Sequence, residues 1–388
     1  MKERGGDLSL LEIHLDRVRW NYLSLQETLA AGTGCAAMVK ADAYGLGAVA
    51  VAPELSKAGC RHFYVATFEE GLAVREALDA QSPLLRKAGT GHAGGVSEEA
   101  QIYVLHGSYD ASPEEFAEYN LIPAMNSLGD IGRWSSIAKT TGRRPPAILH
   151  LDTGMNSLGL PATEADRLIN DAGMLKPLDV RIVMSHLACA DEPEHPKNRE
   201  QLELFRRRTK QLALPCLLSF ANSAGTFLGT EYHFDQVRSG RAIFGLNPRP
   251  ALQNPMRGTV TLKARILQVR DVGKGETVGY GASYRVTAPS KLATISAGYA
   301  DGYLRSLTGS GTVYVGEQRC PVVGRVSMNA VVADVSAVTP LPHAGEWAEI
   351  IGRHQTVEEV AAQARMRPSE VLTSLDMKGA RIYSGHGS

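Results

Sequence analysis

The sequence predicts an α/β protein with two domains, an N-terminal (β/α)8 barrel of the TIM type over residues 12–245 and a mostly β domain over residues 246–388. Short apolar runs alternate with amphipathic stretches in the first part of the chain. These runs are continuously apolar, which is typical of parallel strands buried on both faces. After Gly245 the helical spacing disappears, and Gly and Asp turns separate the runs.

The predicted barrel strands leave room for a helix after each of them. Helical spacing of apolar residues is clear at 68–77 and 199–212. Repeated strand–helix units over about 250 residues favour a barrel, although a doubly wound open sheet would give a similar rhythm. The strands are predicted at residues 36–39, 63–66, 102–105, 122–125, 147–151, 181–186, 216–220 and 242–244.

The second domain is predicted from shorter strand-like runs and two late helices. The N-terminal segment, residues 1–11, is expected to pair with this domain. Its strands are predicted at 259–269, 292–295, 312–315 and 331–335, and its helices at 356–365 and 368–374.

Charge and composition exclude several classes of protein. Lys plus Arg and Asp plus Glu both number 41, so bulk charge gives no reason to expect a nucleic-acid or membrane partner. The sequence contains no apolar run long enough for a transmembrane helix, and residues 1–12 lack the apolar core of a signal peptide. Five scattered cysteines without a CxxC pair argue against disulfides and zinc. We therefore expect a cytoplasmic protein without a metal site.

Lys40 directly follows the first predicted strand, at the end of the barrel where such enzymes keep their chemistry. A lysine at the end of a buried strand is costly to leave charged, and its neutral amine can bond covalently to an aldehyde cofactor. By itself, such a lysine more often reaches past the barrel rim to solvent. The surrounding residues decide between these interpretations.

Lys40 belongs to the first of eight sequence blocks that resemble, in the same order, the alanine racemase family of fold-type III pyridoxal-phosphate enzymes. The resemblance implies a (β/α)8 barrel followed by a β domain, in agreement with the residue pattern. The blocks are VKADAYGLG (39–47), HLDTGMNSLGL (150–160), SHLACADE (185–192), FANSAG (220–225), VRSGRAIFGLNP (237–248), VGYGASYR (278–285), AGYADGY (297–303) and VGRVSMN (323–329).

The resemblance implies four catalytic residues. Lys40 would carry pyridoxal phosphate and act as one proton-transfer base, and Tyr284 would be the second base, supplied by the other subunit of a homodimer. A tyrosine is a poor base unless a partner stabilises its phenolate, and His186 matches the histidine with that role. Arg238 matches the arginine that faces the pyridine nitrogen and, being permanently protonated, keeps that nitrogen unprotonated.

Other matched positions would bind the cofactor phosphate and the substrate. Tyr44, Ser223 and the backbone amides of Gly240 and Arg241 would hold the phosphate. Gly240 has its own physical reason, since a residue without Cβ lets an amide approach a phosphate closely. Met328 would offer its backbone amide to the substrate carboxylate, next to Tyr284.

Four departures from the family pattern surround the substrate pocket. Ser157 stands where the family usually has an arginine that contacts the substrate carboxylate, and a hydroxyl cannot replace a bidentate cation. His150 stands where many members have a carbamylated lysine that orients this arginine. Ser369 aligns with a tyrosine beside the phosphate, and Asn329 replaces an aspartate. These changes bear on the substrate and on turnover, and they leave the catalytic positions in place.

Two other kinds of enzyme and one kind of non-enzyme share parts of this pattern. Amino-acid decarboxylases of the same fold carry a His-Gly-Ser block and a catalytic cysteine, and metal-assisted aldolases need a C-terminal metal cluster; the sequence shows neither. Pyridoxal-phosphate carriers are single barrels without the second domain that contains Tyr284. We therefore expect a racemase that interconverts L- and D-alanine for D-alanine biosynthesis, with a racemase of another or a broader set of amino acids as the alternative.

Overall fold

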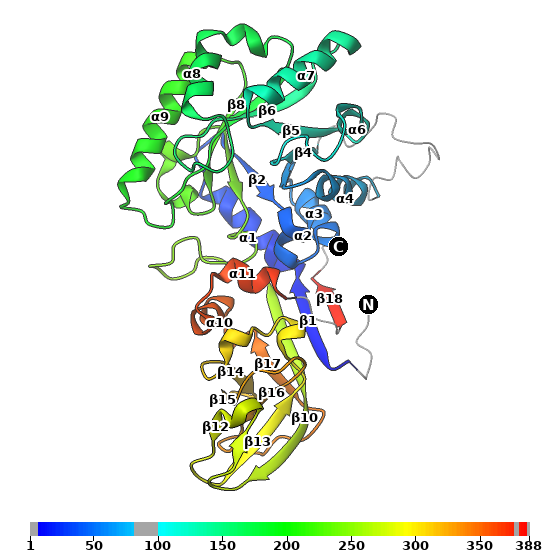
Figure 1. The fold of residues 1–388 in the computed structure, drawn as a ribbon, viewed down its shortest axis with the longest axis vertical. Coiled ribbons are helices and arrows are strands. Elements are labelled where there is room, and N and C mark those ends of the chain that lie inside the picture. Colours follow the sequence, from blue (N-terminus) through cyan, green and yellow to red (C-terminus); the bar gives the residue numbers. More distant parts are fainter. Residues whose placement is uncertain (1–6, 81–99, 376–379, 386–388) are drawn as a thin grey trace.

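A computed structural model describes residues 7–80, 100–375 and 380–385. Its N-terminal part is a closed barrel of parallel strands, as predicted, and a doubly wound open sheet is excluded. The barrel forms the upper half of the molecule in Figure 1. Its strands are β2 (Gly34–Met38), β3 (His62–Val65), β4 (Gln101–Val104), β5 (Leu121–Met125), β6 (Pro146–His150), β7 (Asp179–Met184), β8 (Leu217–Asn222) and β9 (Gln236–Ser239).

Alternate residues of the barrel strands are buried on opposite faces, which explains their continuously apolar sequences. In β2, Ala36 and Met38 point into the barrel and pack with Tyr64 and Tyr103. The neighbouring Ala37 belongs to the larger core between the barrel and its helices. Both faces therefore exclude water, as a parallel sheet requires.

The eighth barrel strand, β9, lies at residues 236–239, so the prediction of a strand at 242–244 is wrong. β9 reads QVRS, and its polar side chains obscured it in the sequence. Gln236 accepts a hydrogen bond from the Tyr64 hydroxyl at 2.7 Å inside the barrel, so this polar residue is satisfied without water. Residues 242–244 are apolar because they are buried in the turn that follows β9.

Helices surround the barrel, and some of them begin with a side-chain cap. Thr67 caps α4 by accepting from the Glu70 amide, and Ser127 caps α7 by accepting from the Asp130 amide. None of the described helices is long and apolar enough to cross a membrane. The helices are α1 (Leu15–Glu27), α3 (Ala48–Lys57), α4 (Phe68–Asp79), α6 (Pro113–Glu118), α7 (Leu128–Thr141), α8 (Ala162–Asn170) and α9 (Pro196–Leu212).

The second domain is built on a mostly antiparallel sheet in the order β13-β16-β15-β14-β17-β10-β1-β18. The N-terminal strand β1 pairs antiparallel with β10 and parallel with β18, so both ends of the chain join this sheet. A two-stranded ribbon, β11 (Thr277–Val278) with β12 (Tyr284–Arg285), lies apart from it. The strands of the main sheet are β1 (Ser9–His14), β10 (Val260–Val272), β13 (Ser290–Ile295), β14 (Thr312–Val315), β15 (Gln318–Val323), β16 (Val331–Asp334), β17 (Trp347–Ile351) and β18 (Ala380–Ser384).

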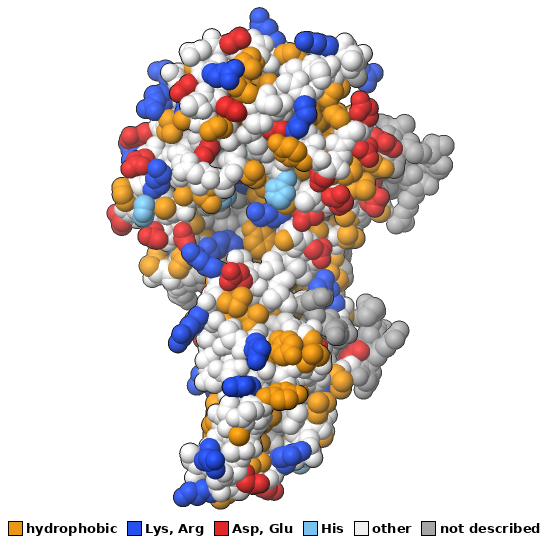
Figure 2. Space-filling view, viewed as in Figure 1, with side chains coloured by type: hydrophobic (Ala, Val, Ile, Leu, Met, Phe, Trp, Pro, Cys, Tyr) orange, Lys and Arg blue, Asp and Glu red, His pale blue; other side chains and the backbone are white. Residues whose placement is uncertain are grey.

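Two late helices, α10 (Val357–Ala364) and α11 (Pro368–Thr373), lie at the junction of the two domains, and α11 is the one next to α2 (Lys40–Gly45) (Figure 1). A Cβ added to Gly45 would lie 2.9 Å from the carbonyl oxygen of Leu372, so α11 packs directly on the turn that begins with Lys40. Acidic and basic side chains are interspersed over the face of the barrel in Figure 2, in line with the zero net charge. The predicted fold class is confirmed.

Candidate active site

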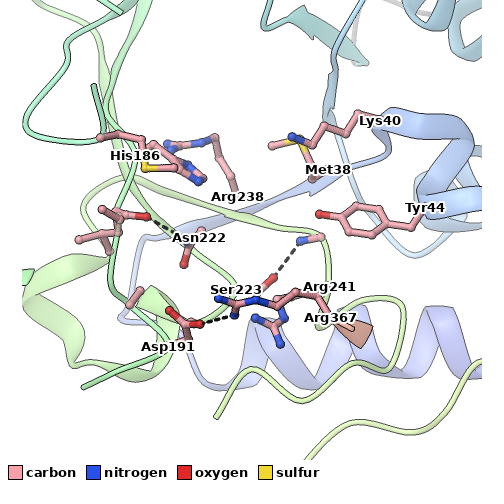
Figure 3. A pocket seen from close by; sticks show the side chains of 16 residues that line it. Met38, Lys40, Tyr44, His186, Asp191, Asn222, Ser223, Arg238, Arg241 and Arg367 are labelled. Carbon is pink, nitrogen blue, oxygen red and sulfur yellow. Dashed lines mark hydrogen bonds and ion pairs between the residues drawn. The ribbon is translucent and has the colours of Figure 1, made fainter. Parts of the chain in front are cut away.

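A pocket of 310 Å³ opens at the carboxyl ends of the barrel strands. The ends of β2, β8 and β9 and the segments after β2, β6, β7, β8 and β9 line it, together with Arg367 at the start of α11. Figure 3 shows Lys40, His186 and Arg238 toward one end, and Ser223, Arg241 and Arg367 toward the other. The predicted site residues that the structure brings together here are Lys40, Tyr44, His186, Ser223, Arg238, Gly240 and Arg241.

Lys40 and Tyr44 begin and end an unusual left-handed turn within α2. Ala41, Asp42, Ala43 and Tyr44 all have φ between 51° and 59°, a region that costs L-residues roughly 1–2 kcal/mol each. Hydrogen bonds offset this cost: Glu70 Oε1 accepts from the Ala41 amide at 2.8 Å, and Asp42 Oδ1 accepts from the amide of the residue that begins α3 at 2.7 Å. The strained turn directs both Lys40 and Tyr44 into one pocket.

At the other end of the pocket, Ser223 accepts hydrogen bonds from two backbone amides. Its buried hydroxyl oxygen accepts from the Gly240 amide at 3.0 Å and from the Ala242 amide at 3.3 Å, and it lies 3.0 Å from the Ser239 hydroxyl. Burial raises the pKa of Tyr44 to about 12, so its hydroxyl is protonated and available as a donor. Hydroxyl and amide donors at this end suit an anionic group.

Arg238 is 3% exposed and lies on β9 at the opposite end of the pocket. Its guanidinium donates to the Ser219 hydroxyl at 2.7 Å and to the backbone carbonyls of Ser185 and Phe220. Burial lowers the pKa of Arg238, but an arginine remains protonated at working pH. The three acceptors are neutral, so the positive charge of Arg238 is not cancelled by a carboxylate that bonds to it.

Two histidines next to Arg238 are held neutral. Burial lowers the pKa of His186 to about 3, and the charge of Arg238 acts in the same direction. Burial likewise lowers the pKa of His150 to about 4, and its Nδ1 donates to Asn126 Oδ1 at 2.8 Å. Within the described part of the chain, the His186 ring has no hydrogen-bond partner, so it is free to bond to a group that enters the pocket.

Three predicted site residues lie outside the lining of this pocket. Tyr284 lies on β12 in the second domain, and Met328 is 55% exposed there. Ser157 is exposed on the loop after β6, although its neighbour Met155 reaches the pocket. Two of the departures from the family pattern also lie outside the lining: Asn329 is exposed, and Ser369 is half-buried near the start of α11. One chain therefore assembles the cofactor end of the predicted site without the predicted second base.

Nine residues of the pocket lining were not singled out in the sequence, among them Met38, Asp191, Asn222 and Arg367. Asp191 and Asn222 belong to recognised blocks, so their position after barrel strands was an available signal. Arg367 follows no strand, and only the packing of α11 on α2 brings it to the pocket. Among the described residues, no group of three His, Cys, Asp or Glu side chains could hold a metal ion.

Family models match nearly the whole chain. The N-terminal domain model of alanine racemase matches residues 13–248, and the C-terminal domain model matches residues 259–383. Relatives named alanine racemase from Brucella canis and Rhodospirillum rubrum are both 40% identical to this chain, over 96% and 97% of its length and 93% and 96% of theirs. A relative from Mesorhizobium japonicum named catabolic alanine racemase is also 40% identical, over 97% of this chain and 93% of its own.

Solved structures of alanine racemases superpose on nearly the whole chain. Alanine racemase from Bartonella henselae with covalently bound pyridoxal phosphate superposes with a TM-score of 0.89 at 37% identity, covering 97% of this chain and 99% of that one. Alanine racemase from Streptomyces coelicolor gives a TM-score of 0.88 at 30% identity, covering 98% and 99%. The resemblance inferred from the sequence blocks is confirmed: the chain belongs to the alanine racemase family, whose members are pyridoxal-phosphate-dependent enzymes.

Proposed function

We propose that this protein is a pyridoxal-phosphate-dependent racemase that interconverts L- and D-alanine by proton transfer between two bases. Lys40 is one base, and Tyr284 of the partner subunit is the other. The enzyme works in the cytoplasm as a homodimer and supplies D-alanine for biosynthesis. The observation that carries the proposal is the pocket itself, in which a lysine after the first barrel strand faces a cradle of anion-binding donors.

The residues of the pocket fit pyridoxal phosphate. The amine of Lys40, which lines the pocket, would bond to the cofactor's aldehyde. The Tyr44 hydroxyl can lie against residue 240 only because this residue has no side chain, since a Cβ there would lie 2.5 Å from the hydroxyl oxygen. The Tyr44 hydroxyl, the Ser223 hydroxyl and the Gly240 amide, which donates to Ser223 in this structure, would bind the phosphate. When bound, the cofactor supplies an electron-withdrawing ring that acidifies the α-proton of an amino acid.

Arg238 limits how far that acidification goes. Its charge is buried and hydrogen-bonded to neutral acceptors, so it disfavours a second positive charge nearby. Arg238 would therefore keep the pyridine nitrogen of a bound cofactor unprotonated. The cofactor would then supply weaker electron withdrawal, which favours simple return of the proton over side reactions.

Racemisation needs a base on each face of the substrate. Lys40 approaches from the side of β2, and the second base must come from the opposite side. Tyr284 lies on the ribbon of the second domain, outside the pocket of its own chain, which supports a contribution to the pocket of the partner subunit. The His186 ring, neutral and without a partner among the described residues, is available to bond to that phenol and stabilise its deprotonated form.

This chain offers fewer groups to bind the substrate carboxylate than to bind the cofactor. Met328 is positioned by the resemblance to offer its backbone amide, and Ser157 supplies no charge. Ser157, Ser369 and Asn329 together leave a pocket with less charge and less side-chain bulk than the family pattern implies. A racemase of another or a broader set of amino acids is the second candidate, and it is favoured by these three residues.

Incubating the purified holoenzyme with L-alanine tests the proposal directly. The proposal expects D-alanine to form until the two enantiomers are equal, as measured by chiral chromatography. Lys40→Ala should abolish the reaction, while Lys139→Ala, at an exposed position on α7, should leave it unchanged. A panel of other L-amino acids separates the two candidates. No racemisation of any amino acid by the yellow holoenzyme would refute the proposal.

A further inference from the structure

The end of the pocket nearest Ser223 carries two arginine side chains with different origins. Arg241 follows β9 in the barrel, and Arg367 precedes α11 in the second domain. Figure 3 shows both of them beside Ser223 and away from Lys40. Because α11 packs on the turn between Lys40 and Gly45, the position of Arg367 is fixed relative to the cofactor lysine.

The charges that line the pocket are unbalanced. Its described lining contains the cations Lys40, Arg238, Arg241 and Arg367, and Asp191 is the one carboxylate among those residues. Lys40 lies toward the other end, and Arg238 already donates to three neutral acceptors there. Two cations therefore remain near Ser223 for an anionic ligand.

Neither arginine has its donors fully used. Arg241 donates through Nη2 to the carbonyl of Asn247 at 3.1 Å, but its buried Nε has no hydrogen-bond partner in the described part of the chain. Arg367 makes one ion pair, from Nη1 to Asp191 Oδ2 at 3.1 Å, and its side chain is 73% exposed. An exposed ion pair of this kind contributes little to stability, because water screens it. Asp191 is therefore a partner that a stronger anion can replace.

We propose that Arg241 and Arg367 form a cationic end of the pocket for the cofactor phosphate, and that Arg367 exchanges Asp191 for this phosphate when the cofactor binds. The inference rests on the proposed function, in that the ligand is pyridoxal phosphate. A phosphate dianion carries more charge than a carboxylate and accepts the paired N–H groups of a guanidinium. Asp191 holds Arg367 at the mouth of the pocket until then. The second domain thereby contributes to cofactor binding in its own chain.

Cofactor binding to the apoenzyme tests this exchange without measuring turnover. Dissociation constants are measured by fluorescence titration for pyridoxal phosphate and for pyridoxal, which lacks the phosphate. Arg367→Gln should weaken pyridoxal phosphate binding by about ten- to a hundredfold, the range for one charge-assisted hydrogen bond, and leave pyridoxal binding unchanged. Arg367→Lys should recover part of the loss. Asp191→Asn should tighten pyridoxal phosphate binding severalfold, because it removes the competitor.

The exchange predicts that the two substitutions change the affinity for pyridoxal phosphate in opposite directions, which a merely structural ion pair would not do. If the pair only joined the domains, Arg367→Gln and Asp191→Asn would both lower the melting temperature, and neither would change the preference for pyridoxal phosphate over pyridoxal. That result would overturn the inference. If Arg367→Gln does not fold, the shifts in Arg367→Lys and Asp191→Asn decide. Arg353→Gln, an exposed arginine on the second domain paired with Glu317, is the matched control and should behave as wild type.

The same titration separates the inference from the function on which it rests. A wild-type apoenzyme that does not bind pyridoxal phosphate would refute the proposed function. A wild type that prefers pyridoxal phosphate to pyridoxal, with Arg367→Gln and Asp191→Asn showing the same preference, would overturn the arginine exchange alone.

Discussion

The Tyr44 hydroxyl lies directly against the backbone of Gly240, so close that a Cβ on residue 240 would come within 2.5 Å of the phenolic oxygen. Tyr44 has little room to retreat, because it is packed against Phe244 with ring centroids 4.9 Å apart. The same added atom would lie 3.0 Å from Met38 Cβ. The absence of a side chain at residue 240 therefore lets the Tyr44 hydroxyl lie beside the Gly240 backbone, where we expect the cofactor phosphate.

Gly240→Ala should weaken pyridoxal phosphate binding by about ten- to a hundredfold, since overfilling a packed site typically costs about 1–3 kcal/mol. The measurement is a fluorescence titration of the apoenzyme, with the melting temperature followed in parallel. Gly132→Ala is the control, because a Cβ there meets nothing within 4 Å on α7. Wild-type affinity in Gly240→Ala would contradict the phosphate site.

Lys40 should be the residue that bonds to the cofactor, because it is the lysine that lines the pocket among the described residues. The purified protein should be yellow, and borohydride reduction should fix the cofactor on the peptide that contains Lys40. Peptide mass spectrometry identifies the modified residue. Finding the cofactor on any other lysine would refute the assignment.

The barrel could be predicted because its strands are buried on both faces, so their sequences are continuously apolar. β9 was missed because the barrel interior is polar at that point, where Gln236 bonds to Tyr64 and Arg238 enters the pocket. Apolar spacing cannot reveal a strand whose inward side chains belong to the site.

The cofactor end of the site could also be predicted, since its residues follow barrel strands in recognisable blocks. The position of Arg367 could not be predicted. It reaches the pocket because α11 packs on α2, and these two helices are more than 300 residues apart in sequence. Ser157 shows the opposite case: the sequence indicated its importance, but within one chain it is exposed and outside the pocket lining.

Acid should destabilise the apoenzyme through its buried histidines. The native pKa of His150 is lowered to about 4, below the unfolded value of about 6.5, so its neutral form contributes stability above pH 6.5 that is lost as the pH falls toward 4. Between pH 6.5 and 4.5, the protonation of His150 should lower the free energy of unfolding by about 2 kcal/mol, as measured by urea denaturation. His150→Gln should reduce this dependence, and His343→Gln, on the surface, should not. Equal pH dependence in wild type and His150→Gln would contradict the account.

The position of Ser157 should limit binding of the substrate carboxylate. A charge-assisted contact typically contributes about 1.5–3 kcal/mol, or roughly ten- to a hundredfold in affinity. Ser157→Arg should therefore lower KM for alanine by about ten- to a hundredfold, as measured by steady-state kinetics. Ser157→Ala is the control and should leave KM unchanged. An unchanged or raised KM in correctly folded Ser157→Arg would show that another group binds the carboxylate.

Mixed dimers of two inactive variants test most directly whether each active site combines Lys40 with Tyr284 of the partner subunit. One chain carries Lys40→Ala and the other Tyr284→Phe, and each variant alone should be nearly inactive. In a heterodimer with shared sites, one site contains both defects and the other contains neither, so co-expression should restore up to half of the wild-type activity per heterodimer. If both bases act within one chain, every site lacks one of them. Heterodimers that are confirmed by mass and show no recovered racemisation of alanine would contradict the shared, two-base site.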